Sequence, residues 1–252
     1  MKLYEPSIFT WNIEDTDTIT FTDTTPTQAL FAVDNDRETL VRSDTANPSL
    51  ILTLATGRTG TASSVWVKVL GYTNVEVIAD SESLGSVAIS TTGALAGYAY
   101  LEFTETTARR WILLFTGVGG VWEAYLQRQI LDFNTDDKRP QRTETLEIPG
   151  VFMRSKGGVL INFNEFSFSG GAATITMEWE ALSDEATEEL LVAWRSGTPR
   201  SRELGVYPKP TYEPNFFYQA KWVSNFAFVP SGEAIEDAYA GSAVFEELPN
   251  RL

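Results

Sequence analysis

Short runs in which apolar residues alternate with polar ones, often threonine, recur throughout this chain. They include TITFTDTT (18–25), SLILTLAT (49–56), SVWVKVLGY (64–72), NVEVIAD (74–80) and AATITMEWEAL (172–182). β-Branched and aromatic residues favour strands, and an alternation of period two places successive side chains on opposite faces of a sheet. Because Gly, Asn, Asp and Ser separate the runs, the pattern predicts a mainly β protein of sandwich or barrel type. The pairs Gly119–Gly120 and Gly157–Gly158 are interpreted as hairpin turns.

One segment, SDEATEELLVAWRSG (183–197), carries the signals of a helix instead. Ser183 or Asp184 can cap its N-terminus, and acidic residues fill its first turn. Apolar residues recur at every fourth position and therefore share one face, namely Ala186, Leu190 and Trp194. The spacing predicts an amphipathic helix over about 184–196 that covers a sheet.

The stretch NTDDKRPQRTE (134–144) is the best candidate for a boundary between domains, because it is highly charged and contains no apolar residue. Domain boundaries tend to fall in polar linkers of this kind. We therefore predict a first domain over residues 1–134 and a second β domain, which carries the helix, over residues 135–252.

Charge and composition exclude several classes of function. The chain has 34 acidic residues against 19 Lys and Arg, a net charge of −15 that is spread evenly, so no nucleic acid or anionic membrane partner is expected. It has no Cys and no His, which excludes disulfides, Cys/His zinc sites and Ser-His-Asp catalysis. No apolar run reaches the roughly 18 residues of a membrane span, and the first residues lack the apolar region of a signal peptide.

Residues 25–133 contain an order of features that resembles the discoidin-like, or galactose-binding-like, β-sandwich. An aspartate-rich loop is followed by alternating strands in residues 29–86, and then by TARRWILLFTG (107–117) and VWEAYLQRQILDF (121–133) as a late strand and a final strand. The resemblance implies an antiparallel jelly-roll sandwich whose ligand loops gather at one end. The two cysteines that often link extracellular members are absent.

The second half resembles domains of tail-tip and baseplate proteins of tailed bacteriophages. The features that carry this resemblance are strands flanking one helix, a Pro-rich aromatic connection in residues 201–232, and a closing AVFEEL (243–248). The resemblance implies a non-catalytic structural protein that is assembled in the host cytoplasm into the virion tail, with other tail proteins and copies of itself as partners.

The loop FAVDNDRETLVRSD (31–44) is the first candidate site. Asp34, Asp36 and Thr39 offer hard oxygen ligands at close spacing, which Ca²⁺ prefers, and discoidin-like sandwiches often hold a structural calcium at this corner. The alternative is an Asx-type turn in which an aspartate bonds to backbone N–H groups. The same loop could contact a glycan, with Trp122 as an exposed aromatic platform; the candidate ligand-binding residues are Asp34, Asn35, Asp36, Arg42 and Trp122.

The stretch YPKPTYEPNFFYQAKW (207–222) is the second candidate. Its aromatic residues either pack over their own domain or anchor a neighbouring subunit, since aromatic residues are enriched at the centres of interfaces. The candidate interface residues are Tyr207, Tyr212, Phe216, Phe217 and Tyr218, with Arg200 and Arg202 from the preceding basic loop.

The composition leaves carboxylate catalysis and hard-metal chemistry open, and paired carboxylates could indicate a glycosidase. Glu178 and Glu180 lie on one face of a predicted strand, as the solvent side of an amphipathic strand would, and Glu246 and Glu247 point to opposite faces. We therefore predict no enzyme activity. The leading hypothesis is a structural tail component, possessing at most weak glycan binding; the alternative is a free-standing carbohydrate-binding module or lectin.

Overall fold

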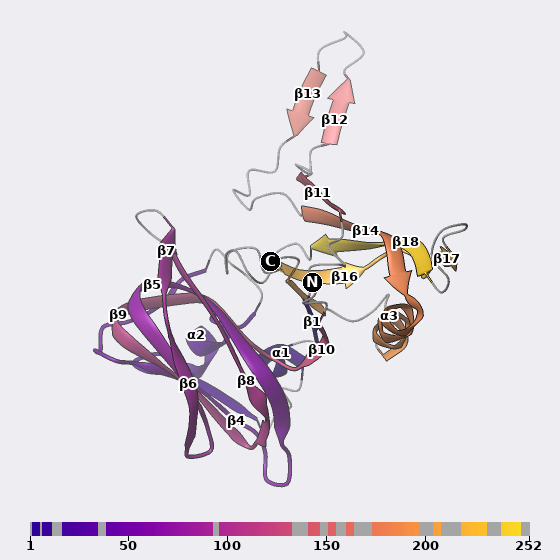
Figure 1. Ribbon diagram of the computed structural model, residues 1–252. Helices are drawn as coiled ribbons and strands as arrows, with labels where there is room; N and C mark the ends of the chain where they lie inside the picture. The colour runs from indigo at the N-terminus through magenta and orange to yellow at the C-terminus, as the bar shows by residue number, and fades with distance from the viewer. Residues whose placement is uncertain are drawn as a thin grey trace. The chain divides into compact units, whose positions relative to one another are not determined.

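The computed structural model divides the chain into two compact units (Figure 1). Unit 1 combines residues 1–134, 203–219 and 250–252, and unit 2 combines residues 135–202 and 220–249. Residues 203–219, which the sequence assigned to the second domain, therefore belong to unit 1. The structure describes residues 2–5, 7–11, 17–34, 39–92, 96–132, 141–146, 151–154, 160–163, 173–196, 204–207, 218–230 and 238–247.

Unit 1 is built on one antiparallel sheet. Its strand order is β2 (Thr18–Phe21), β4 (Ser49–Thr53), β9 (Arg110–Gln127), β5 (Gly60–Ala79), β8 (Ala96–Ala108) and β7 (Ser90–Thr92). In addition, β3 (Val41–Ser43) pairs with β9, and β6 (Glu82–Ala88) pairs with β5. This unit also contains two short helices that the sequence analysis missed, α1 (Ile8–Trp11) and α2 (Pro26–Leu30).

The strands β5 and β9, of 20 and 18 residues, are longer than predicted. Each joins two predicted strands, and their shared register shifts near Leu70 and Tyr72. Gly71 and Gly117 adopt positive φ there, at 78° and 111°, which only glycine adopts readily. The chain therefore bends at bulges where the sequence suggested turns.

The interpretation of Gly119–Gly120 as a hairpin turn is wrong, because both residues lie inside β9. A Cβ atom on Gly119 would lie 1.9 Å from the carbonyl oxygen of Leu70. Glycine is present here so that two backbones can approach closely, which is a second common reason for glycine in a strand. Gly157–Gly158 lies outside the described residues.

The alternation along the strands sorts side chains into two buried clusters of unit 1. The larger cluster takes one face of β5, including Val65, Val67, Val75 and Val77, together with Leu50 and Leu52 of β4 and Trp111, Leu113 and Phe115 of β9. Trp66 is also buried but belongs to a second, aromatic cluster with Tyr4, Tyr125 and Tyr207. In the first half of β5, side chains on both faces of the strand are therefore buried. The alternation of apolar and polar residues alone could not reveal this.

The N-terminal strand β1 (Lys2–Tyr4) pairs with β10 (Gln129–Asp132) on one side and β15 (Leu204–Tyr207) on the other. Tyr207 of β15 is 1% exposed and packs edge-on against Tyr100, with ring centroids 4.9 Å apart. The prediction that Tyr207 anchors a neighbouring subunit is therefore wrong. The alternative, packing within its own domain, holds for this residue.

Unit 2 is a small antiparallel sheet with one helix. β14 (Ala173–Ser183) pairs with β11 (Gln141–Leu146) and β18 (Ala238–Glu247), and β18 pairs further with β16 (Tyr218–Trp222) and β17 (Phe228–Pro230). A separate hairpin joins β12 (Val151–Arg154) and β13 (Leu160–Phe163). The mainly β class that the sequence predicts is confirmed.

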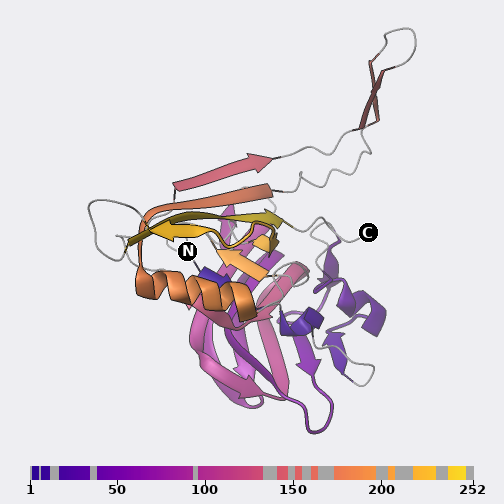
Figure 2. The same ribbon diagram turned by 90° about the vertical axis from the view of Figure 1, so that its right-hand side faces the viewer.

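The helix α3 (Asp184–Ser196) has the predicted bounds and contacts β14 and β18 (Figure 2). The Ser183 hydroxyl accepts the backbone N–H of Ala186 at 3.3 Å, so Ser183 is the N-cap. Ala186 and Leu190 are buried, as the spacing predicted. Among the described residues, no helix has the length and apolar character to cross a bilayer.

Candidate functional site

A cavity of about 330 Å³ opens in unit 1 beside the loop that the sequence singled out. Its walls come from the turn after β2, from α2 and from β3 with the residue before it. The lining residues are Asp23, Thr24, Gln28, Phe31 and residues 40–42. Arg42, a predicted ligand-binding residue, is among them. Ligand cavities in proteins start at about 300 Å³, so this one suits a small ligand.

The helix α2 places Gln28 through a capping box. The Thr25 hydroxyl accepts the backbone N–H of Gln28 at 3.3 Å, and the Gln28 side-chain oxygen accepts the backbone N–H of Thr25 at 3.0 Å. These bonds fix which end of the Gln28 amide points back to the helix start. Its N–H₂ group donates to no described residue, so it is available at the cavity wall.

Asp23 fixes the turn after β2 to the end of β3. It adopts φ 64°, and its Oδ2 accepts the hydroxyl of Ser43 at 3.2 Å and that of Thr45. The hydrogen bond from Thr45, with that from Ser43, lowers the pKa of Asp23 below its usual range. Asp23 is therefore a carboxylate that stays ionised in the cavity wall.

The position of β3 depends on a glycine of the neighbouring strand. Arg42 faces Gly120 of β9 in the register, and a Cβ atom there would lie 2.7 Å from both the Val41 oxygen and a Leu40 methyl. A side chain at residue 120 would thus push away the strand that carries Arg42. Gly120 is a positioning residue of the cavity that the hairpin interpretation concealed.

Phe31 gives the cavity an exposed aromatic ring. Its side chain is 40% exposed directly after α2, and the neighbouring Leu30 is 41% exposed. An aromatic face beside Arg42, Gln28 and Asp23 combines apolar contact with directional hydrogen bonding. Such a lining can hold a ligand that has both an apolar face and polar edges.

Of the other predicted ligand and metal residues in this loop, Asp34 and Thr39 do not line the cavity. Asp34 and Thr39 are half-buried, and Asn35 and Asp36 lie outside the described residues. In the described part of the chain, no group of three or more His, Cys, Asp or Glu is arranged to hold a metal ion. The structural calcium that the sequence suggested therefore stays a prediction.

Trp122 does not line the cavity. It is half-buried on β9, and the Lys68 ammonium lies 5.3 Å from its ring centroid. The Lys68 ammonium thus forms a cation–π contact with one face of the ring. The structure thus brings Arg42 together with Phe31, and not with Trp122.

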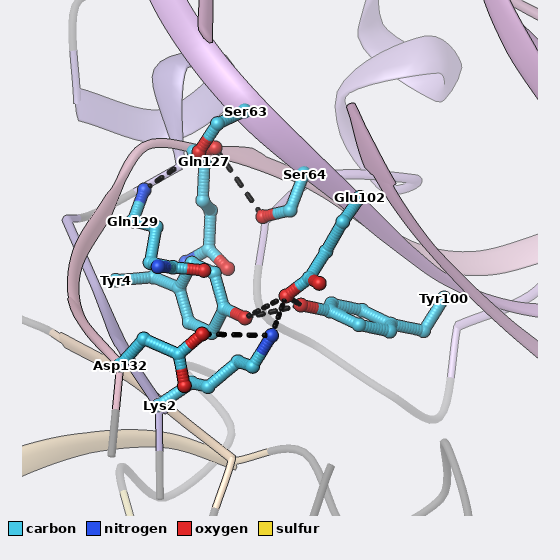
Figure 3. A network of polar contacts seen from close by, with 9 residues as sticks. All are labelled: Lys2, Tyr4, Ser63, Ser64, Tyr100, Glu102, Gln127, Gln129 and Asp132. Carbon is cyan, nitrogen blue, oxygen red and sulfur yellow. Dashed lines mark hydrogen bonds and ion pairs between the residues drawn. The ribbon is translucent and has the colours of Figure 1, made fainter. Parts of the chain in front are cut away.

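A second polar constellation in unit 1 joins Lys2, Tyr4, Tyr100, Glu102 and Asp132 (Figure 3). The Glu102 carboxylate accepts Lys2, Tyr100 and, at 3.2 Å, the Tyr4 hydroxyl, while Lys2 also pairs with Asp132 at 3.3 Å. Burial raises the pKa of Glu102, but the donated bonds from Lys2 and Tyr100 outweigh it and the net shift is downward. A carboxylate held ionised by three donors is a poor general acid. The network instead links β1 to β8 and β10 and stabilises their packing.

We expect Glu102→Gln to lower the free energy of unfolding by about 1–2 kcal/mol, because it removes the charge from several charge-assisted bonds at a site still 39% exposed. The matched control is Glu105→Gln on the same strand, whose ion pair with Arg128 lies at the surface and contributes about 0–1 kcal/mol. Urea denaturation measures both variants. Equal losses would show that the network adds nothing beyond a surface pair.

The other predicted site residues lie largely beyond what the structure describes. Tyr212, Phe216, Phe217, Arg200 and Arg202 are outside the described residues, and of Tyr218 only the backbone, in β16, is described. Glu178 and Glu246 are exposed. The side chains of Glu180 and Glu247, their predicted partners, are not described.

Comparisons with known proteins were made for the whole chain. No protein-family model and no curated protein matches it. A family 32 carbohydrate-binding module of Clostridium perfringens, bound to GalNAc-β-1,3-galactose, is 17% identical, with a TM-score of 0.36 over 44% of this chain and 94% of that one. A second C. perfringens module of the family, from NanJ and bound to galactose, is 15% identical, with a TM-score of 0.37 over 51% and 100%.

A fucosidase of Ruminococcus gnavus, in complex with fucose, is also similar to this chain. It is 15% identical, with a TM-score of 0.37, and the match covers 52% of this chain and 27% of the enzyme. None of these similarities assigns the chain to a family. The predicted role in a phage tail receives no support from these comparisons.

Proposed function

We propose that unit 1 binds a saccharide in the cavity between α2 and β3 and does not change it chemically. One observation carries the proposal: an exposed aromatic ring, Phe31, shares a cavity of about 330 Å³ with Arg42 and Gln28. A sugar ring has an apolar C–H face for the aromatic side chain and a rim of oxygens for planar donors. The guanidinium of Arg42 can hold two such oxygens at once.

The same cavity supports binding and not hydrolysis. Glycoside hydrolysis in most families needs two carboxyl groups on opposite sides of the scissile bond. Asp23 is the sole carboxylate among the seven described residues that line the cavity. The bonds from Thr45 and Ser43 keep it ionised, so it is a poor proton donor.

We expect Arg42→Ala to weaken saccharide binding about 10- to 100-fold, because one charge-assisted hydrogen-bonding group contributes about 1.5–3 kcal/mol. A glycan array of neutral and acidic sugars identifies the ligand, and calorimetry with that ligand measures the loss. Arg110→Ala is the matched control, since Arg110 is exposed at the other end of the sheet and does not line the cavity.

Two results would contradict this proposal. The first is a wild-type chain that binds no saccharide on the array. The second is binding that Arg42→Ala and Arg110→Ala weaken equally, because general charge and not the cavity would then explain the affinity.

Assembly into a phage tail tip or baseplate, with copies of this chain or other tail proteins as partners, stays a prediction. Its candidate anchors lie mostly outside the described residues, and Tyr207 is buried in unit 1. Native mass spectrometry of the purified chain tests this prediction, because a ring would give a mass equal to a whole-number multiple of the mass of one chain.

A further inference from the structure

We propose that the saccharide bound in this cavity carries a carboxylate, as uronic and sialic acids do, and that Arg42 and Gln28 bind that group. This inference rests on the proposed function and specifies the class of ligand. It follows from which polar groups of the cavity already form hydrogen bonds or ion pairs within the protein and which do not.

Among the described residues that line the cavity, Arg42 is the one cation, and no described carboxylate binds it. Lys2, Arg58 and Arg128 each form ion pairs within unit 1. No described carboxylate pairs with Arg42, although Asp23 lines the same cavity. Its side chain is exposed on β3, with the planar N–H groups that bind a carboxylate through two parallel bonds.

Gln28 offers a second donor beside Arg42. Its side-chain oxygen is used by the capping box, where it accepts from both the backbone N–H and the hydroxyl of Thr25 at 3.0 Å. What remains for a ligand is the N–H₂ end, which can only donate. Gln28 therefore acts on a ligand as a donor alone.

Asp23 and Thr24 supply side-chain acceptors among the described residues that line the cavity. Asp23 accepts bonds from Ser43 and Thr45, and Thr24 donates its hydroxyl hydrogen to the Phe21 carbonyl at 2.8 Å. A neutral sugar presents hydroxyls, which need acceptors as well as donors, whereas an ionised carboxylate only accepts. The uncommitted donors of Arg42 and Gln28 thus match the two oxygens of a carboxylate, while the oxygens of Thr24 and Asp23 remain as acceptors for the hydroxyls of the same saccharide.

The test compares an acid with its own neutral form. Calorimetry measures galacturonic acid disaccharide against its methyl ester, and sialyllactose against lactose, at low and high salt. We expect each acid to bind at least about tenfold more tightly than its neutral counterpart, and to lose that advantage as salt screens the charge. The two acid arms distinguish a uronate from a sialate as the source of the group.

Gln28→Glu is the most informative variant, because glutamate is equally suited to the capping box and so leaves α2 intact. It replaces the N–H₂ donor with a negative oxygen at the same place. We expect it to abolish the preference for the acid over the methyl ester and to leave thermal stability unchanged. Arg42→Gln, which keeps a planar donor without charge, should lower the affinity for the acid to that for the ester.

Each outcome separates the inference from the proposed function. Equal affinity of wild type for acid and ester would overturn the carboxylate assignment while leaving saccharide binding intact. A preference for the acid that survives Gln28→Glu and Arg42→Gln would place the carboxylate elsewhere and also overturn it. Failure of every sugar to bind would remove the proposed function itself.

Discussion

Trp66→Ala is expected to lower the free energy of unfolding of unit 1 by about 3–5 kcal/mol, the range for losing a large buried aromatic side chain. Trp66 is 1% exposed and stacks on Tyr125 with ring centroids 5.2 Å apart, while Tyr98 lies 5.9 Å away. Its removal leaves a cavity among rings drawn from β1, β9 and β15. Urea denaturation followed by circular dichroism measures the loss.

The matched control for this change is Trp122→Ala on the neighbouring strand. Trp122 is half-buried, and its described ring contact is with the Lys68 ammonium, so we expect a loss of about 1 kcal/mol or less. Equal losses for the two tryptophans would contradict the placement of Trp66 in a closed aromatic cluster.

Gly119→Ala is expected to destabilise unit 1 by about 3 kcal/mol or more, at the upper end of what overpacking costs. The added methyl group would lie 1.9 Å from the Leu70 carbonyl oxygen, and a backbone atom cannot move aside as a side chain can. Strands β5 and β9 would have to separate where they bend. Because Ser43 pairs with Gly119, the proposed binding of saccharide in the cavity beside β3 should weaken in the same variant.

Gly57→Ala separates the two possible costs of replacing a glycine. Gly57 has φ 86° but no atom within 4 Å of a Cβ position, so alanine there meets backbone strain of about 1–2 kcal/mol and no collision. Gly119 presents the collision without the positive φ. Thermal unfolding should give Gly119→Ala a clearly lower melting temperature than Gly57→Ala. The reverse order would show that the two strands do not approach each other so closely at Gly119.

The sequence predicted those parts of the fold in which a local pattern is compatible with only one type of secondary structure. Alternation gave the strands, and the spacing of Ala186 and Leu190 with a cap at Ser183 gave α3. It could not distinguish a glycine that turns the chain from one that admits a neighbouring backbone, so β9 was divided in two at Gly119. Nor could it show that β15 returns to β1, since that pairing joins residues about 200 positions apart.

The candidate site was predicted in part. Arg42 was predicted as a ligand contact because its guanidinium can bind two oxygens at once, and it lines the cavity, but Phe31 and Gln28 were overlooked. A capping box of the form T-P-x-Q was present in residues 25–28 and would have predicted α2, and with it the place of Gln28. Trp122 was predicted to be exposed because it follows the supposed Gly119–Gly120 turn, yet that turn is absent and a lysine lies over its ring.

The pairing of β1 with β15 has a consequence for the chain during translation. Leu204 leaves the ribosome only after residues 135–202, a delay of several seconds at about 5–20 residues per second. Throughout that interval the nascent protein presents β1 as an open edge and an aromatic surface that Tyr207 has yet to cover. Ribosomes stalled before codon 204 should therefore hold unit 1 in a protease-sensitive state, which limited proteolysis of the stalled chains would detect.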